Sequence, residues 1–238
     1  MNVFPVRGLP AIREGDDLPA LVLARVELED GDVVVFAQKG VSKAEGRVVR
    51  LEDVEPSERA HELAGDDDPR RTEVILRESA EIVRERVPLL IVRTRHGFTC
   101  ASAGVDASNT EPGTLVLLPV DPDASAARLR RRFRELADVD VGVIVSDSFG
   151  RPFRQGTTDV ALGVAGLAPL LDLRGTRDWS GHELRSTQIA IADEIAGAAQ
   201  LVMPKDAGTP VAIVRGLDVA GDGAARDLVI PPDRDLFR

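Results

Sequence analysis

Two acidic segments of the chain carry side chains of the kind that bind hard metal ions. Asp106 is followed three residues later by Asn109, and Asp147 ends an apolar run and is followed by Ser148. Oxygen-only ligands of this kind suit Mg²⁺ or Mn²⁺ rather than zinc. Each segment also has a plainer interpretation: an Asx-turn or helix cap for the first, and a strand followed by a polar turn for the second. The carboxylates form one site only if the fold brings them together.

A third segment, residues 38–47, follows the apolar run 33–37 and contains Lys39 and Lys43, two of only three lysines in the chain. A strand that ends in such a loop presents ammonium groups and backbone N–H donors to phosphate oxygens. The spacing is not that of the P-loop. A polar hairpin loop is the alternative interpretation.

Other residues with reactive or aromatic side chains are weaker candidates. Cys100 has no metal-ligand or redox spacing around it, so we expect a buried small residue. With three histidines in the chain, a histidine-based zinc site is not expected. Trp179, the only tryptophan, is expected to pack rather than to stack on a planar ligand.

Composition bounds the class of protein. The 238 residues are 43% apolar and carry a net charge of −10, which argues against sequence-independent binding of nucleic acid. No apolar run reaches transmembrane length, and the N-terminus lacks the pattern of a signal peptide. With a single cysteine, these features favour a cytoplasmic protein. The lysine-poor, acidic composition suits either a salt-rich cytoplasm or a GC-rich genome, and the sequence leaves both open.

Helical and extended patterns are mixed through the whole length. We expect helices at 56–64, 69–87, 125–137 and 187–202, the third of them strongly basic with a solvated face. We expect strands at 32–37, 89–92, 114–118, 141–146 and 211–214. Because a clean βαβ rhythm is absent, the fold class is α+β, with mixed β-sheets and flanking helices. We expect one catalytic module over 1–238, and its division into two subdomains stays open.

Together these segments resemble the coenzyme F420-0:γ-glutamyl ligase family. The similarity is in register over nearly the whole chain, and eight short strings carry it. They are Gly8–Ile12, Gly15–Leu18, Gln38–Arg47, Ala103–Asn109, Asp121–Ala126, Ser146–Arg151, Asp193–Ala196 and Val214–Leu217.

The resemblance implies a specific activity. Family members join L-glutamate to the carboxylate of the lactyl-phosphate arm of a deazaflavin, coenzyme F420-0, and often add a second glutamate through a γ-link. GTP activates the carboxylate as an acyl phosphate, and GDP and phosphate are released. Because three anionic reactants must meet, divalent ions and cationic side chains are required to offset their repulsion. Two ions, Mg²⁺ or Mn²⁺, are implied, with K⁺ as a further candidate.

The resemblance also implies site residues. The backbone of Leu9, Pro10, Ala11 and Ile12 corresponds to a part that holds GTP, and Gln38, Lys39, Lys43 and Asn109 correspond to further GTP contacts. Asp106 and Asp147 correspond to ligands of one metal ion, and Ser148 to a ligand of the second. No residue is assigned as general acid, base or nucleophile.

The chain departs from the family pattern at three places. Ser148 replaces a common threonine but keeps the hydroxyl, and Gly40 replaces a bulkier apolar residue, which is expected to loosen the strand end. The loop 203–210 is shorter than its counterpart, and Asp206 is the expected metal ligand there. No C-terminal reductase-like extension is expected. The resemblance alone implies an intertwined homodimer.

Two other function classes stay open at this point. One is a metal-assisted amide ligase on the same scaffold that acts on a different carboxylate. The other is a non-catalytic nucleotide-binding protein. Turnover of precursor, GTP and glutamate would distinguish the F420-0:γ-glutamyl ligase hypothesis from both alternatives.

Overall fold

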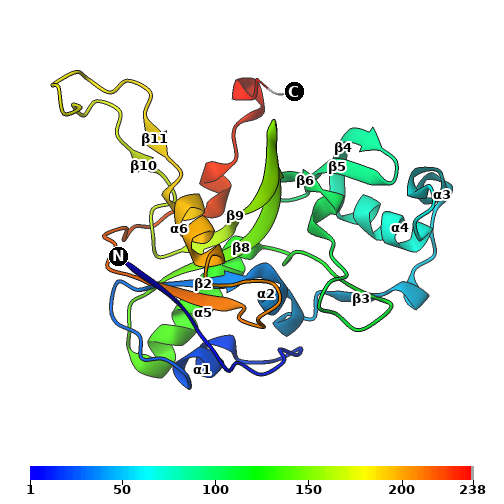
Figure 1. Cartoon of the computed structure of the whole chain (residues 1–238), viewed down its shortest axis with the longest axis horizontal. Coiled ribbons are helices and arrows are strands. Elements are labelled where there is room, and N and C mark those ends of the chain that lie inside the picture. Colours follow the sequence, from blue (N-terminus) through cyan, green and yellow to red (C-terminus); the bar gives the residue numbers. More distant parts are fainter. Residues whose placement is uncertain (237–238) are drawn as a thin grey trace.

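The computed structural model describes residues 1–236, and a five-stranded sheet forms its centre (Figure 1). The strand order is β1-β12-β2-β8-β9; β2 and β8 run parallel, and the other neighbours are antiparallel. These strands are β1 (Asn2–Pro5), β2 (Val33–Ala37), β8 (Gly142–Arg151), β9 (Arg154–Ala165) and β12 (Val211–Arg215).

Helices cover both faces of this sheet. Phe36 of β2 packs against Phe133 on the face covered by α1 and α5, whereas its neighbour Val35 belongs to the core on the other face, with Ile195 of α6. Burial on both faces explains why β2 is an unbroken apolar run rather than an alternating one. The helices are α1 (Leu18–Leu23), α5 (Pro122–Ala137) and α6 (Ile191–Gln200).

Residues 48–116 form a lobe beside the sheet with a third hydrophobic cluster, centred on Ile75, Leu90 and Leu115. The lobe contains a three-stranded sheet in the order β4-β5-β6 and a two-stranded β3-β7 ladder. Its elements are β3 (Val48–Arg50), η1 (Leu51–Asp53), α3 (Glu58–Ala64), α4 (Pro69–Glu78), β4 (Ser79–Arg86), β5 (Leu89–Thr94), β6 (Thr99–Ala101), η2 (Ser102–Gly104) and β7 (Thr114–Val116). The division into one module or two subdomains stays a prediction.

An arm of residues 171–189 projects from the body, at the upper left of Figure 1. Its base is the short ladder between β10 (Leu171–Asp172) and β11 (Gln188–Ile189). Trp179, near its tip, is fully exposed, so the expectation that it packs within the chain is wrong. The remaining elements are α2 (Gln38–Ala44), η3 (Ala225–Leu228) and η4 (Pro232–Arg234). In the described residues no helix has the length and apolarity needed to cross a membrane.

The α+β class with mixed sheets and flanking helices is confirmed, as are the five predicted strands. The predicted helix 125–137 begins earlier, at Pro122, because the Asp121 carboxylate accepts the Ala124 N–H and caps it. Its arginines face solvent and pair with acidic side chains, as expected; Arg128 with Glu45 is one example.

The predicted helix 69–87 is wrong in its second half. The helix α4 ends at Glu78, and Ser79 begins the strand β4 with its hydroxyl bonded to the Ile75 carbonyl. The following residues include the β-branched Ile82 and Val83, and Ile82 pairs with Val92 of β5. A partner strand and β-branched residues therefore outweigh the apolar spacing that suggested a helix.

Two other boundaries also differ from expectation. The predicted helix 187–202 is α6, which begins only at Ile191, because Gln188 and Ile189 pair with the arm strand β10. The predicted lysine loop, 38–47, is mostly the helix α2. Gly40 lies inside this helix, and a Cβ there would stand 3.1 Å from the Ile12 side chain, so this glycine permits tight packing rather than loosening a strand end.

Candidate active site at the carboxyl edge of the central sheet

Two parallel strands bring the predicted phosphate and metal segments together. β2 and β8 pair in parallel with Ala37 opposite Ser146, so β2 ends beside the middle of β8, which continues to Arg151. Lys39, in the first turn of α2, therefore lies near Asp147 of β8. Ligand sites form at such carboxyl edges because the chain leaves the sheet there.

A third strand returns the loop 203–210 to this edge. β12 runs antiparallel to β2, and the Ala37 N–H donates to the Pro210 carbonyl at 2.8 Å. The loop and the strand ends enclose a cavity of about 520 Å³. Ten residues predicted for GTP or metal line it, namely Pro10, Ala11, Ile12, Gln38, Lys39, Lys43, Asn109, Asp147, Ser148 and Asp206. Two predicted residues do not: Leu9 packs against the sheet core, and Asp106 lies behind Lys39.

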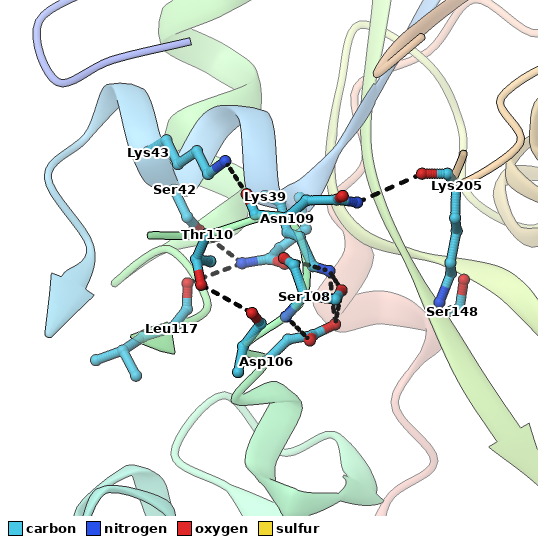
Figure 2. A network of polar contacts seen from close by, with 12 residues as sticks. Lys39, Ser42, Lys43, Asp106, Ser108, Asn109, Thr110, Leu117, Ser148 and Lys205 are labelled. Atoms are coloured by element: carbon cyan, nitrogen blue, oxygen red, sulfur yellow. Dashed lines mark hydrogen bonds and ion pairs between the residues drawn. The ribbon is translucent and has the colours of Figure 1, made fainter. Parts of the chain in front are cut away.

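The lobe supplies Asp106 and Asn109 to the rim of this site, where α2 holds them (Figure 2). The Lys39 ammonium lies 2.6 Å from an Asp106 carboxylate oxygen and also donates to the hydroxyl of Ser108. Lys43 donates to the Asn109 carbonyl at 2.6 Å. The Asn109 side chain donates across the site to the Lys205 carbonyl at 3.4 Å. The two lysines thus attach the lobe to the sheet as well as facing the cavity.

Gln38 has a structural role in this arrangement. Its buried amide donates to the Ser42 hydroxyl at 2.7 Å and to the Leu117 carbonyl at 2.8 Å. These bonds fix the start of α2 to the chain that leaves the lobe. The predicted GTP contact of Gln38 stays a prediction, and in this structure both amide hydrogens are used within the protein.

The two predicted metal carboxylates have opposite pKa shifts. Burial alone raises the pKa of Asp106, but bonds from Lys39 and Ser108 outweigh it and hold that pKa below the usual range. For Asp147, burial raises the pKa to about 7; a bond from the Ser148 N–H opposes the rise, and the charges of Asp159 and Asp106 add to it. Burial, with the neighbouring Lys39 charge, lowers the pKa of Lys43.

The sequence interpretation missed Asp159, Ser146 and Gln200, which also line the cavity. Asp159 lies on β9 directly opposite Ser148, and its buried carboxylate accepts from Ser146 at 3.0 Å and from Ser148 at 2.6 Å. Gln200, at the end of α6, donates to Ser148 at 3.2 Å. The signal for Asp159 was the pair of apolar runs 142–145 and 160–165 around a turn, which indicates a hairpin with polar residues facing each other.

Cys100 is buried, as expected, and burial together with the nearby Asp147 charge raises the pKa of its thiol to about 12. The thiol therefore stays protonated and unreactive near neutral pH.

The chemistry of the site fits hard cations bound together with an anionic ligand. In residues 1–236 no group of three or more His, Cys, Asp or Glu side chains is close enough to hold a metal alone. The available donors are carboxylate and hydroxyl oxygens on one wall, with two ammonium groups beside them. Mg²⁺ is commonly held in this way, by one or two carboxylates plus substrate phosphates and water.

Comparison with known proteins agrees with this reading. The family described as F420-0:Gamma-glutamyl ligase matches residues 8–216. The protein named Coenzyme F420:L-glutamate ligase is 48% identical in Methanopyrus kandleri and 45% identical in Archaeoglobus fulgidus. Both alignments cover 100% of this chain and 98% and 96% of the relative. The chain therefore belongs to the F420-0:γ-glutamyl ligase family, and it is an enzyme that forms a carbon–nitrogen bond.

Proposed function

We propose that this protein is a GTP-dependent ligase that joins L-glutamate to the terminal carboxylate of coenzyme F420-0. The relatives' names supply the deazaflavin and glutamate. The observation that carries the GTP assignment is the position of Lys39, Lys43, Asp147 and Ser148 around one cavity at the carboxyl edge of β2 and β8. Ammonium groups beside a cluster of oxygen ligands are suited to a nucleotide triphosphate with its divalent ions.

Asp106, Asp147 and Ser148 would hold two divalent ions, Mg²⁺ or Mn²⁺, with Asp206 as a further candidate ligand and K⁺ as a candidate monovalent ion. Divalent ions neutralise phosphate charge and stabilise the transferring phosphoryl group. Lys39 and Lys43 would add positive charge beside these ligands, and Asn109 and the backbone of residues 9–12 would position the nucleotide. These interactions lower the repulsion between the γ-phosphate and the incoming carboxylate.

The reaction then proceeds in two steps. A carboxylate oxygen of F420-0 takes the γ-phosphoryl group, which breaks the bond to GDP and makes an acyl phosphate. The glutamate amine attacks the acyl carbon, the carbon–nitrogen bond forms, inorganic phosphate leaves, and the amine proton passes to solvent. The product ends in a carboxylate, so a second glutamate can follow by the same chemistry.

The decisive experiment is incubation of the purified protein with F420-0, GTP, L-glutamate, K⁺ and either Mn²⁺ or Mg²⁺, with mass spectrometry of the deazaflavin. We expect a mass gain of one or two glutamyl residues, lost without GTP, in EDTA, or with the Asp147→Asn variant. Absence of any mass gain with either ion would overturn the ligase assignment. GTP binding without turnover would favour a non-catalytic nucleotide-binding protein, and turnover with another acid would favour a different amide ligase.

We also propose that the protein works as a homodimer in which the arm 171–189 contacts a second copy. The arm extends beyond the body of one chain, and its Trp179 and Leu171 expose apolar surface. Burial of a tryptophan contributes a large share of interface energy. Light scattering after size exclusion should give twice the chain mass, and Trp179→Ala should weaken the association. A monomer at micromolar concentration would contradict this proposal.

A further inference from the structure

We infer that Asp159 is a positioning residue that turns the Ser148 hydroxyl oxygen toward the cavity as a cation ligand. This inference rests on the proposed function, because the cation is the one that accompanies the nucleotide. Asp159 is 7% exposed and lies across the β8–β9 ladder from Ser148. No ion pair to it exists among residues 1–236; its carboxylate accepts from two hydroxyl groups, and the Asp147 carboxylate lies nearby.

The hydrogen-bond directions follow from the donors and acceptors available. A carboxylate only accepts, so Ser148 must donate its single hydrogen to Asp159, at 2.6 Å. The Gln200 amide then donates to one of the two lone pairs of the Ser148 oxygen, at 3.2 Å. One lone pair remains. Because Ser148 lines the cavity, this lone pair is free for a cation there.

A second bond set keeps Asp159 and Gln200 in place. The other carboxylate oxygen of Asp159 accepts from the buried Ser146 hydroxyl at 3.0 Å. The Asp159 backbone N–H donates to the side-chain oxygen Oε1 of Gln200 at 3.1 Å. The NH₂ end of the same side-chain amide therefore faces Ser148. Strand β8, strand β9 and helix α6 thus jointly set the orientation of one hydroxyl.

An Asp159→Asn variant should reverse this orientation. The new amide best keeps its carbonyl oxygen on buried Ser146, whose hydrogen has no solvent to turn to, and places its NH₂ group against Ser148. Ser148 then accepts two bonds and points its hydrogen into the cavity, where it repels a cation. Groups that orient metal ligands in this way typically change metal affinity by about 10- to 100-fold when they are replaced.

The test measures Mn²⁺ binding by electron paramagnetic resonance, with GTP present and F420-0 absent, so that no turnover is required. We expect Asp159→Asn and Ser148→Ala each to weaken binding of one Mn²⁺ by about 10- to 100-fold. Ser148→Thr, which keeps the hydroxyl, should bind as the wild type. Ser146→Ala removes the other donor to Asp159 but leaves the bond from Ser148 to Asp159, so it should weaken Mn²⁺ binding by less than Asp159→Asn does.

The double variant Asp159→Asn/Ser148→Ala decides whether Asp159 acts through Ser148. If it does, the double variant binds Mn²⁺ no more weakly than Ser148→Ala alone, because the hydroxyl that Asp159 orients is already absent. Additive losses, or an equal loss in Ser146→Ala with a matching fall in melting temperature, would overturn the inference. Wild-type protein that binds two Mn²⁺ with GTP yet never extends F420-0 would instead contradict the proposed function and leave the positioning result standing.

Discussion

Asp106 and Asp147 meet at one site, but their surroundings differ in rigidity and in charge. Asp147 lies within the central strand β8, and its neighbour Ser148 is held by Asp159 of β9 and Gln200 of α6. Asp106 belongs to the lobe and reaches the site through Lys39 and Ser108. Asp106 forms an ion pair with Lys39, whereas the pKa of Asp147 is raised chiefly by burial, with the charges of Asp159 and Asp106 adding to the rise and the Lys39 charge opposing it.

This difference indicates that the two carboxylates have different roles. A carboxylate that is largely buried without an ion-pair partner costs folding free energy. Such carboxylates are typical of functional sites, where a ligand can supply the missing positive charge. The paired carboxylate costs less, but under the proposed function it would have to exchange its ammonium partner for a metal ion. Under the proposed function, the strand side would therefore receive a cation without losing an ion pair, whereas the lobe side would first have to release Lys39.

The largest effect should follow from removal of the unpaired carboxylate. Asp147→Asn keeps the shape and removes a hard-cation ligand, so we expect turnover to fall by more than about 1,000-fold, equivalent to several kcal/mol of transition-state stabilisation. Mass-spectrometric product formation measures it. Asp106→Asn is the matched comparison and should lose less, because Lys39 then becomes free to bind phosphate. A variant Asp147→Asn with near-normal turnover would remove the metal assignment.

The next effect concerns the ammonium partner on the lobe side. Lys39→Met should raise the KM for GTP by about 10- to 100-fold, because it removes a charge-assisted phosphate contact of about 1.5–3 kcal/mol. In the absence of GTP it should tighten Mn²⁺ binding, since Asp106 no longer has a competing cation. Lys205→Met is the matched comparison, because Lys205 also lines the cavity but has no ion pair with Asp106, so no carboxylate is released there. Weaker Mn²⁺ binding by Lys39→Met without GTP would contradict the idea that Asp106 exchanges Lys39 for a metal ion.

The two sides also differ in how far sequence predicted them. The unbroken apolar run before Asp147 located the strand β8 correctly, because such a run is a local pattern, but the predicted strand end at Asp147 is wrong, since pairing with β9 extends β8 to Arg151. The proximity of Asp106 depends on the return of the lobe to α2, over contacts more than 60 residues apart in sequence such as Lys39 with Ser108. No local pattern encodes such a contact. Asp159 was missed because its importance comes from strand register, and α4 was overextended because the partner strand β5 is not visible in a local window.

A pH dependence should distinguish the two carboxylates in the metal-free protein. The pKa of Asp147 rises from 3.8 to about 7 on folding, so the folded state binds a proton more tightly than the unfolded one. The free energy of unfolding therefore falls as pH rises from about 4 to 7. Asp147→Asn lacks this pH-dependent loss, so at pH 8 in EDTA it should be more stable than the wild type by about 1–3 kcal/mol. This is less than the full pKa shift implies, because nearby water screens the charge. Denaturation at pH 4 should give nearly equal stabilities.

A gain of stability in Asp147→Asn that is the same at pH 4 and pH 8 would point to packing rather than to charge. Asp106→Asn should change the free energy of unfolding at high pH in the opposite direction. Its pKa is lowered in the folded state, so its contribution is present above the unfolded pKa and is lost as pH falls through the folded value. This variant should therefore be less stable than the wild type at pH 8.

The smallest effect should come from the hydroxyl that supports Asp106. Ser108→Ala removes the bond from the Ser108 hydroxyl to Asp106, at 3.2 Å, and a bond that Lys39 donates, but it keeps the Ser108 backbone N–H that donates to Asp106 at 2.7 Å. Loss of such bonds on a partly exposed group costs about 0.5–1.5 kcal/mol, so we expect a 2- to 10-fold rise in the KM for GTP with little change in kcat. Steady-state kinetics at saturating Mn²⁺ measures this split. Because Ser108 contacts only the lobe side, Mn²⁺ bound at Ser148 should be unaffected, and a loss there would show that the two sides are not independent.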